Sequence, residues 1–174
     1  GEAINGTKKV VDYLKNKKEK INFCLVGEPT NPNKLGEMIK IGRRGSLNGK
    51  LIINGVQGHV AYPKQANNPS TTIVKILSKL NDIKFDNGTK DFQPTNLEVT
   101  KININNNADN VIPGSAEATF NIRFNNKHSS NSIIKKLNRI FKIICKKNKC
   151  KYKINYRVSG EAFITKPNST TFMV

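Results

Sequence analysis

The order of hydrophobic periodicities between Ser46 and Ser159 is the feature of this sequence that most constrains its fold. Apolar residues alternate with polar ones, as in a strand, in four segments, and recur at helical spacing in two others. Along the chain the order is strand, helix, strand, strand, helix, strand. This is the order of the ferredoxin-like split β-α-β arrangement, in which one antiparallel sheet carries two helices on one face. We therefore predict an α/β fold of the α+β type, βαββαβ, for this region.

The strand segments differ in how regular their alternation is. In the second segment the alternation that begins at Leu97 and Val99 changes phase near Lys101, which predicts a β-bulge. Gly55 ends the first segment, and the turn Pro113-Gly114 precedes the third. The apolar positions of the other three strands are Leu47, Leu51 and Ile53; Ala116, Ala118, Phe120, Ile122 and Phe124; and Tyr152, Ile154, Tyr156 and Val158.

The two helical segments each follow a capping signal. Asn68 and Pro69 supply a cap and a first-turn proline for the first helix. Asn131 or Ser132 is the predicted cap of the second helix. The apolar stripes are Ile73, Val74, Ile76, Leu77 and Leu80 in the first helix, and Ile133, Ile134, Leu137, Ile140, Phe141, Ile144 and Cys145 in the second.

The first forty or so residues do not belong to this pattern. Apolar residues at helical spacing predict a helix from Thr7, which can cap it, to Glu19. The apolar run Ile21 to Val26 predicts a buried strand that Pro29 terminates. A helix followed by a buried strand is half of an α/β unit without its neighbours. The chain is therefore interpreted as a section of a larger protein.

The amino-acid composition indicates which classes of partner the protein can have and in which cellular compartment it works. The 174 residues include 30 Lys and Arg against 12 Asp and Glu, a formal charge of +18. Lys greatly outnumbers Arg and there is no Trp, which is unlike proteins that read nucleic acids with arginine forks and aromatic stacking. No apolar run is long enough to span a membrane. With three Cys and no secretory leader, we expect a cytoplasmic protein with no specific nucleic-acid partner and no membrane partner.

Two residues in loops or at strand ends carry potential chemistry. His59 follows Gly58 between a strand and a helix, where its imidazole can donate to a developing oxyanion or transfer a proton, or simply be solvated. Glu28 stands at the end of the predicted first strand, where its carboxylate can bind a metal or cap a turn. No HExxH or CxxC motif accompanies Glu28, so the residues alone leave both interpretations open.

The remaining reactive side chains have simpler interpretations. Arg43 and Arg44 can clamp an anionic substrate or be ordinary surface charges, and the same holds for Arg123. Of the two cysteines at the end of the second helix, Cys145 is predicted to lie in the core and Cys150 to be exposed. His128 is predicted to be a turn residue.

Several blocks of sequence, in order along the chain, resemble the zinc-dependent M20 peptidase family, and within it the desuccinylases. The matching blocks are Cys24 to Thr30, Gly42 to Gly49, Gly55 to Pro63, Asn68-Pro69, Asn110 to Pro113, Phe120 to Phe124, and Ser159-Gly160. Family members have a catalytic domain with two zinc ions and an inserted ferredoxin-like lid that dimerises. The resemblance implies that residues 44–159 form the lid, and that residues 1–43 and 160–174 are flanking pieces of the α/β catalytic domain.

The resemblance also implies roles for individual residues. Glu28 corresponds to a ligand of one of the two zinc ions, for which cobalt can substitute. His59 corresponds to the lid histidine that reaches the active site of the other subunit in a homodimer. Substrate-binding or site-ordering positions correspond to Arg43, Ser46, Tyr62, Asn110 and Arg123.

The implied reaction is hydrolysis of N-succinyl-LL-2,6-diaminopimelate to succinate and LL-2,6-diaminopimelate, in the biosynthesis of lysine and diaminopimelate. The other metal ligands and the general base of the family have no counterpart between Gly1 and Val174, so this chain by itself is expected to be inactive. Asn105 to Asn107 replace a glycine-containing stretch that is usual before Asn110. The alternatives are another N-acyl amino acid deacylase of the same family and a non-catalytic ferredoxin-like binding module.

Overall fold

The computed structural model describes residues 6–22, 24–27 and 31–165. The chain divides into two units, Gly1–Ile39 and Lys40–Val174. In the first unit, helix α1 (Thr7–Asn16) confirms the predicted helix. The predicted cap is wrong, because Gly6, with a φ of 94°, occupies the N-cap and no side chain caps the helix.

The predicted buried strand at residues 21–26 is not formed. Among the described residues of this segment Ile21, Leu25 and Val26 are exposed, and Leu25 retains 87% of its accessible surface. A strand needs a neighbour that pairs with its N–H and C=O groups. The described part of the first unit contains no strand that could provide this pairing.

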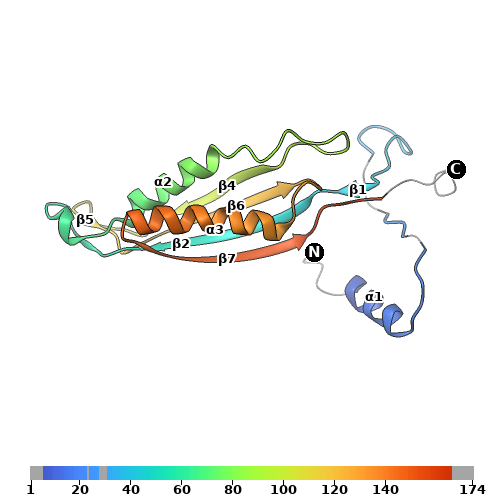
Figure 1. Cartoon of the computed structure of the whole chain (residues 1–174), viewed down its shortest axis with the longest axis horizontal. Helices are drawn as coiled ribbons and strands as arrows, with labels where there is room; N and C mark the ends of the chain where they lie inside the picture. Colours follow the sequence, from blue (N-terminus) through green and yellow to red (C-terminus); the bar gives the residue numbers. More distant parts are fainter. Residues whose placement is uncertain (1–5, 23, 28–30, 166–174) are drawn as a thin grey trace. The chain divides into compact units, whose positions relative to one another are not determined.

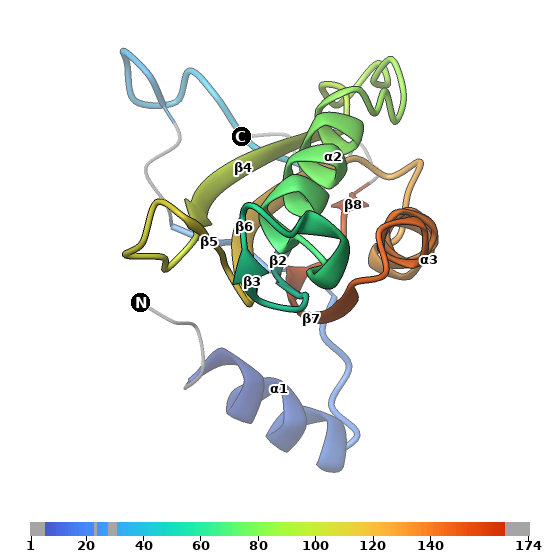
Figure 2. The ribbon, with the colours of Figure 1, turned by 90° about the vertical axis from the view of Figure 1, so that its left-hand side faces the viewer.

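The second unit is built on a four-stranded antiparallel sheet. The strand order is β4-β6-β2-β7, and α2 and α3 cover one face of the sheet (Figure 1, Figure 2). This order and connectivity confirm the predicted ferredoxin-like arrangement. In chain order the elements are β2 (Gly45–Asn54), α2 (Pro69–Asn81), β4 (Asn96–Asn103), β6 (Ser115–Phe124), α3 (Ser130–Lys147) and β7 (Lys151–Gly160).

Two short ribbons extend the unit at either end of β2. Before β2, strand β1 (Gly42–Arg43) pairs with β8 (Phe163–Ile164), so the chain entering the sheet runs beside the chain leaving it. After β2, β3 (Gly58–His59) pairs with β5 (Val111–Ile112). A 3-10 turn, η1 (Pro63–Gln65), follows β3.

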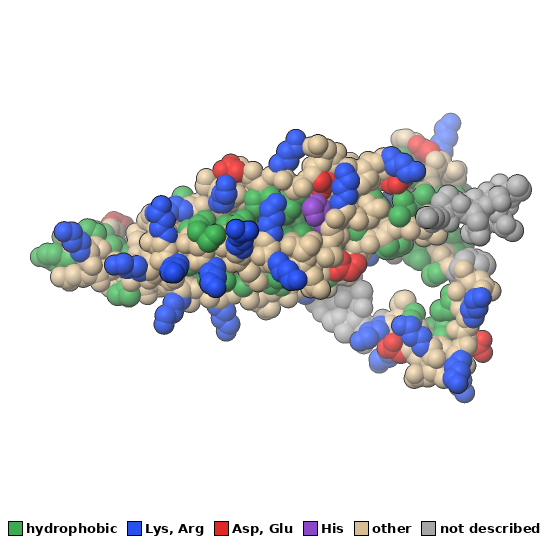
Figure 3. Space-filling view, in the orientation of Figure 1, with side chains coloured by type: hydrophobic (Ala, Val, Ile, Leu, Met, Phe, Trp, Pro, Cys, Tyr) green, Lys and Arg blue, Asp and Glu red, His purple; other side chains and the backbone are tan. Residues whose placement is uncertain are grey.

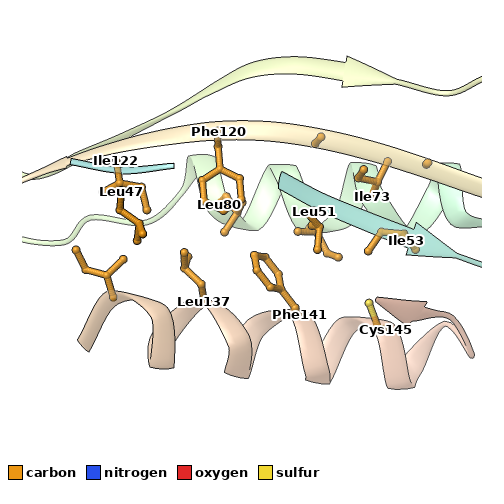
Figure 4. Close-up of a cluster of buried hydrophobic side chains, with 14 of the residues drawn as sticks. Leu47, Leu51, Ile53, Ile73, Leu80, Phe120, Ile122, Leu137, Phe141 and Cys145 are labelled. Carbon is orange, nitrogen blue, oxygen red and sulfur yellow. The ribbon is translucent and has the colours of Figure 1, made fainter. Parts of the chain in front are cut away.

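The core lies between the sheet and the two helices (Figure 4). Figure 4 shows side chains of β2 and β6 facing those of α2 and α3; they include Leu47, Leu51, Ile53, Phe120, Ile122, Ile73, Leu80, Leu137 and Phe141. Gly49 lies directly opposite Phe120, and a Cβ at Gly49 would lie 2.2 Å from the ring. The phenylalanine ring therefore fills the space that the glycine leaves on the neighbouring strand.

The beginning of α2 agrees with the sequence, and one position of its apolar stripe does not. The Asn68 side chain accepts hydrogen bonds from the N–H groups of Ser70 and Thr71, at 2.9 and 3.2 Å. Val74 is 61% exposed because, at 100° per residue, it lies off the buried side of the helix, where Thr72 is buried instead. The predicted bulge of β4 is present between Val99 and Lys101.

Both ends of α3 differ from the sequence prediction. Its cap is Ser129, not Asn131 or Ser132; the Ser129 and Ser132 side chains bond to each other's backbone N–H in a capping box. At the other end Cys150 is buried, not exposed. Its N–H donates to the carbonyl of Cys145 (3.0 Å) across Lys149, whose φ is 52°. This is a Schellman motif, which brings the first residue after the turn against the last turn of the helix.

Asp86 organises the long loop that connects α2 to β4. Its carboxylate accepts hydrogen bonds from the Gly88 N–H (2.6 Å), Asn125 Nδ2 (2.7 Å) and His128 Nε2 (2.9 Å), and from the N–H of Thr95. The Asp86 side chain is 7% exposed. His128 closes a turn, as predicted, and in addition ties that turn to the loop. In the described part of the chain, no helix is long and apolar enough to cross a membrane.

Candidate functional site

Three of the predicted site residues meet on and beside the β3·β5 ribbon. His59 pairs with Val111 in the ribbon, and the Val60 N–H donates to the carbonyl of Asn110 (3.0 Å). The Tyr62 ring lies with its centroid 5.9 Å from that of His59. All three predicted residues are exposed. We call His59, Tyr62 and Asn110 the ribbon cluster.

The loop beside the ribbon is held by an asparagine side chain and not by glycine. The Asn106 side-chain amide donates to the carbonyls of Ala108 (3.1 Å) and Val111 (2.8 Å). These bonds stabilise the turn that leads to Asn110 without a residue in the left-handed region. The asparagine-rich stretch is therefore compatible with an ordered ribbon.

The local backbone selects the tautomer of His59. The Ala61 N–H donates to Nδ1 of His59 at 3.1 Å. A backbone amide can only donate, so Nδ1 is the acceptor, and a neutral imidazole then carries its proton on Nε2. Because the side chain is exposed, this N–H is available as a hydrogen-bond donor to another molecule. Donors held in this way stabilise negative charge that develops on a substrate oxygen.

The other predicted side chains lie at the opposite end of β2. Arg123 on β6 is the cross-strand partner of Ser46 on β2, and Arg43 lies just before β2, on β1. A cavity of about 310 Å³ opens here; its lining residues are Lys40, Gly42, Arg43, Arg44, Phe92 and Arg123. Four of these six carry a positive charge and none a negative one, so the cavity is suited to an anion such as a carboxylate. We call Arg43, Arg44, Arg123 and Lys40 the cation cluster.

Close packing and hydrogen bonds shape the cation cluster. A Cβ at Gly42 would lie 2.7 Å from the carbonyl oxygen of Phe163, so only glycine allows β1 and β8 to approach as they do. Arg44 Nη1 donates to Asn96 Oδ1 (3.2 Å), which orients its guanidinium. Ser46 is buried, and its hydroxyl accepts from Asn121 Nδ2 at 3.4 Å. Within the second unit, the Ser46 hydroxyl is therefore bonded to a side chain of the neighbouring strand β6.

The two clusters cannot contact the same small molecule within one chain. They lie at the two ends of β2, which has 10 residues. At about 3.3 Å per residue the separation is roughly 30 Å. If both clusters act on one small substrate, the second must come from another polypeptide.

Tertiary structure adds Lys40 and Phe92 to the predicted set, and it places Arg44, which the sequence left as either an anion clamp or a surface charge, in the same cavity as Arg43. Lys40 and Phe92 carry no local signal, because Phe92 lies in a long polar loop and reaches the cavity only when that loop folds back. Glu28 lies outside the described residues. Within residues 6–22, 24–27 and 31–165, no group of three or more His, Cys, Asp or Glu side chains could hold a metal ion.

The family model and the curated relatives that match this chain point to the same family. Residues 41–149 match the peptidase dimerisation domain of the M20 group. A succinyl-diaminopimelate desuccinylase of Pelagibacter ubique is 75% identical over 174 residues, which cover 100% of this chain and 45% of that protein. Proteins of the same name from Rickettsia bellii and Parvibaculum lavamentivorans are 49% and 48% identical, over 97% and 100% of this chain. The chain thus spans less than half the length of these curated relatives.

Solved structures share the fold at low sequence identity. A tripeptidase from Staphylococcus aureus superposes with a TM-score of 0.62 at 16% identity, over 75% of this chain and 33% of that one. The aminopeptidase PepT from Bacillus cereus gives a TM-score of 0.60 at 12% identity, over the same shares of the two chains. At these identities the likeness concerns the fold alone.

Proposed function

The chain belongs to the peptidase dimerisation domain family, and we propose that it supplies the lid of an enzyme that hydrolyses N-succinyl-LL-2,6-diaminopimelate to succinate and LL-2,6-diaminopimelate. In this proposal residues 44–159 form the lid, and residues 1–43 and 160–174 belong to the catalytic domain. The names of the curated relatives support the substrate, and the pairing of β1 with β8 supports a lid inserted through two adjacent connections.

The observation that carries the mechanism is the roughly 30 Å between the ribbon cluster and the cation cluster. In a homodimer formed through the lid, His59 of one subunit can enter the active site of the other. The Ala61 N–H donates to Nδ1 of this histidine, so the neutral ring carries its proton on Nε2. In the other active site this Nε2–H donates to the oxyanion that forms when the amide carbonyl is attacked. Tyr62 and Asn110 position the ribbon and the substrate beside His59.

The cation cluster accounts for the acidity of the substrate. N-succinyl-diaminopimelate carries three carboxylates, one on the succinyl group and two on diaminopimelate. Guanidinium groups bind carboxylates in a bidentate manner, and Arg43 and Arg123 face the same cavity. In this proposal Arg43 and Arg123 bind substrate carboxylates, and Ser46 orders the start of β2 beside them.

The metal centre is proposed to lie in the rest of the protein. Its chemistry would be to lower the pKa of a bound water and polarise the amide carbonyl. Glu28 is proposed as one carboxylate ligand of a centre of two zinc ions, or cobalt ions in their place. We propose that the enzyme carries out this biosynthetic reaction in the cytoplasm.

Subunit mixing tests the proposal in a full-length enzyme that carries this sequence. His59→Ala should lower kcat by about 10²- to 10³-fold, the loss typical of an oxyanion donor, with metal content unchanged. Glu28→Ala should lose metal and activity. Random mixing of the two inactive variants should restore about a quarter of wild-type activity, since half of the dimers would be mixed and each would hold one complete site.

Two results would contradict the mechanism. A full kcat for His59→Ala would remove the histidine from the reaction, and mixed variants that stay inactive would exclude a histidine supplied across the dimer. The alternative substrate is tested separately by comparing hydrolysis of succinylated and acetylated diaminopimelate. Faster turnover of the acetylated compound would favour another N-acyl amino acid deacylase.

A further inference from the structure

The two helices that cover the sheet carry only positive charge. Helix α2 has two lysines, and α3 has six lysines and arginines, while neither helix contains an Asp or a Glu. Figure 3 shows Lys and Arg side chains distributed around a hydrophobic patch on the face where these helices lie. The cations are Lys75, Lys79, Lys135, Lys136, Arg139, Lys142, Lys146 and Lys147.

A groove with an apolar floor runs between the two helices. Its volume is about 330 Å³, and its lining residues are Lys75, Ser78, Lys79, Asp82, Ile140, Ile143 and Ile144. Ile143 is 59% exposed although its neighbours on the helix contribute to the core. At one end, Lys75 Nζ donates to Asn148 Oδ1 (2.7 Å), which joins α2 to the end of α3.

Lysines lie on the α2 side of this floor and toward its two ends on α3. Lys79 lies on the α2 side. On α3, Lys136 and Lys147 lie one turn before Ile140 and one turn after Ile143, toward the two ends of the floor, and the Lys136 ammonium also lies over the Phe85 ring, 4.9 Å from its centroid. A ligand on the floor would therefore have its polar edges next to ammonium groups, except beside Asp82, the one carboxylate in the lining.

We propose that this groove binds an acidic amphipathic segment of a partner protein, whose apolar side chains contact Ile140, Ile143 and Ile144 and whose carboxylates face the lysines. Amphipathic segments seat in hydrophobic grooves in this manner, and complementary charge sets their orientation. None of the residues of the ribbon or cation clusters lines the groove. The proposal is therefore independent of the proposed function.

The composition of the exposed face of α2 and α3 favours an acidic protein segment over a nucleic acid or a membrane. Seven of its eight cations are lysines, and the aromatic residue of α3, Phe141, is buried. Such a face lacks the arginine forks and stacking rings with which proteins bind nucleic acids. The exposed apolar surface is confined to a groove, whereas a membrane-binding helix presents a continuous apolar side.

Fluorescence anisotropy with a defined peptide tests the proposal in the full-length protein that carries this sequence. The probe is a labelled peptide of about 15 residues with leucines every three or four positions and glutamate at most others. Ile143→Ser should weaken its binding about tenfold, the effect of losing one buried aliphatic contact. Lys79→Glu should weaken it by about fivefold or more, and added salt should weaken it further.

Matched variants separate the groove from general charge or hydrophobicity. Val74 is 61% exposed on α2 but does not line the groove, so Val74→Ser should change the dissociation constant by less than about twofold. Lys153 alternates with the core-facing Tyr152 and Ile154 and so lies on the other face of the sheet. Lys153→Glu makes the same charge change as Lys79→Glu and should leave the affinity nearly unchanged.

Three outcomes would overturn the proposal. The first is equal weakening by Ile143→Ser and Val74→Ser, or by Lys79→Glu and Lys153→Glu. The second is equal affinity for a peptide of the same composition in scrambled order. The third is tighter binding, unaffected by Ile143→Ser, to phosphatidylglycerol vesicles or to duplex DNA of about 20 base pairs, which would make the face a general polyanion surface.

Discussion

Replacing the Asp86 carboxylate by an amide should destabilise the second unit, and should do so in a pH-dependent manner. The side chain is 7% exposed and accepts hydrogen bonds from the Gly88 and Thr95 N–H groups, Asn125 Nδ2 and His128 Nε2. Asparagine offers one acceptor oxygen and an NH2 group that cannot accept. In Asp86→Asn at least one of these donors therefore faces another donor.

The size of the effect follows from the bonds that change. A hydrogen bond to a charged group contributes about 1.5–3 kcal/mol, and an unpaired buried donor costs a similar amount. With one or two of the bonds lost, the free energy of unfolding should fall by about 2–4 kcal/mol at pH 7. Asp91→Asn, an exposed acid in the same loop, is the matched control and should change it by less than about 0.5 kcal/mol.

The pH dependence follows from the direction of the pKa shift. Burial alone raises the pKa of Asp86, but hydrogen bonds from Thr95, Gly88 and Asn125 outweigh it and hold the pKa well below its ordinary value of 3.8. The stability that the carboxylate provides is thus complete above pH 3.8 and is lost as the pH falls below it. The variant has no carboxyl group at this position, so its difference from the wild type should shrink by up to about 1.4 kcal/mol per pH unit below pH 4.

Urea unfolding followed by far-ultraviolet circular dichroism measures this difference at pH 7 and at pH 3. The wild type and the two variants are compared at each pH, with the slope of the transition as a check that the unfolded states are alike. A gap between the wild type and Asp86→Asn that is the same at both pH values would refute the reasoning. So would an Asp91→Asn variant that loses as much stability at pH 7.

Two further predictions concern packing and substrate binding. Gly49→Ala should lower the free energy of unfolding by about 1–3 kcal/mol in the same urea assay, because its Cβ would lie 2.2 Å from the Phe120 ring. Gly114→Ala, whose Cβ would meet nothing nearer than 4.0 Å, should change it little, and equal losses would contradict the packing argument. In the full-length enzyme, Arg123→Gln should raise KM about tenfold with a smaller effect on kcat, since it removes a charge from the cation cluster. The exposed Arg157→Gln is its control, and an unchanged KM for Arg123→Gln would remove Arg123 from substrate binding.

The sequence was sufficient for the order of the four long strands and two helices of the second unit, because these elements depend on local periodicity. The alternation in β2 and β6, the phase change near Lys101 and the cap at Asn68 are short-range patterns that each element expresses wherever it packs. The prediction failed where burial depends on neighbours. The run Ile21 to Val26 is apolar enough for a strand, but it stays unpaired in the described part of the first unit.

Several features were decided by tertiary structure alone, because they depend on distances between residues that are far apart in the sequence. Cys150 is buried because a Schellman turn brings it against Cys145. Most residues of the candidate site could be named from the sequence, but Lys40 and Phe92 could not, and neither could the separation of the site into two clusters at opposite ends of β2. That separation follows from the rigid length of one extended strand, and it makes the proposed site require a second polypeptide.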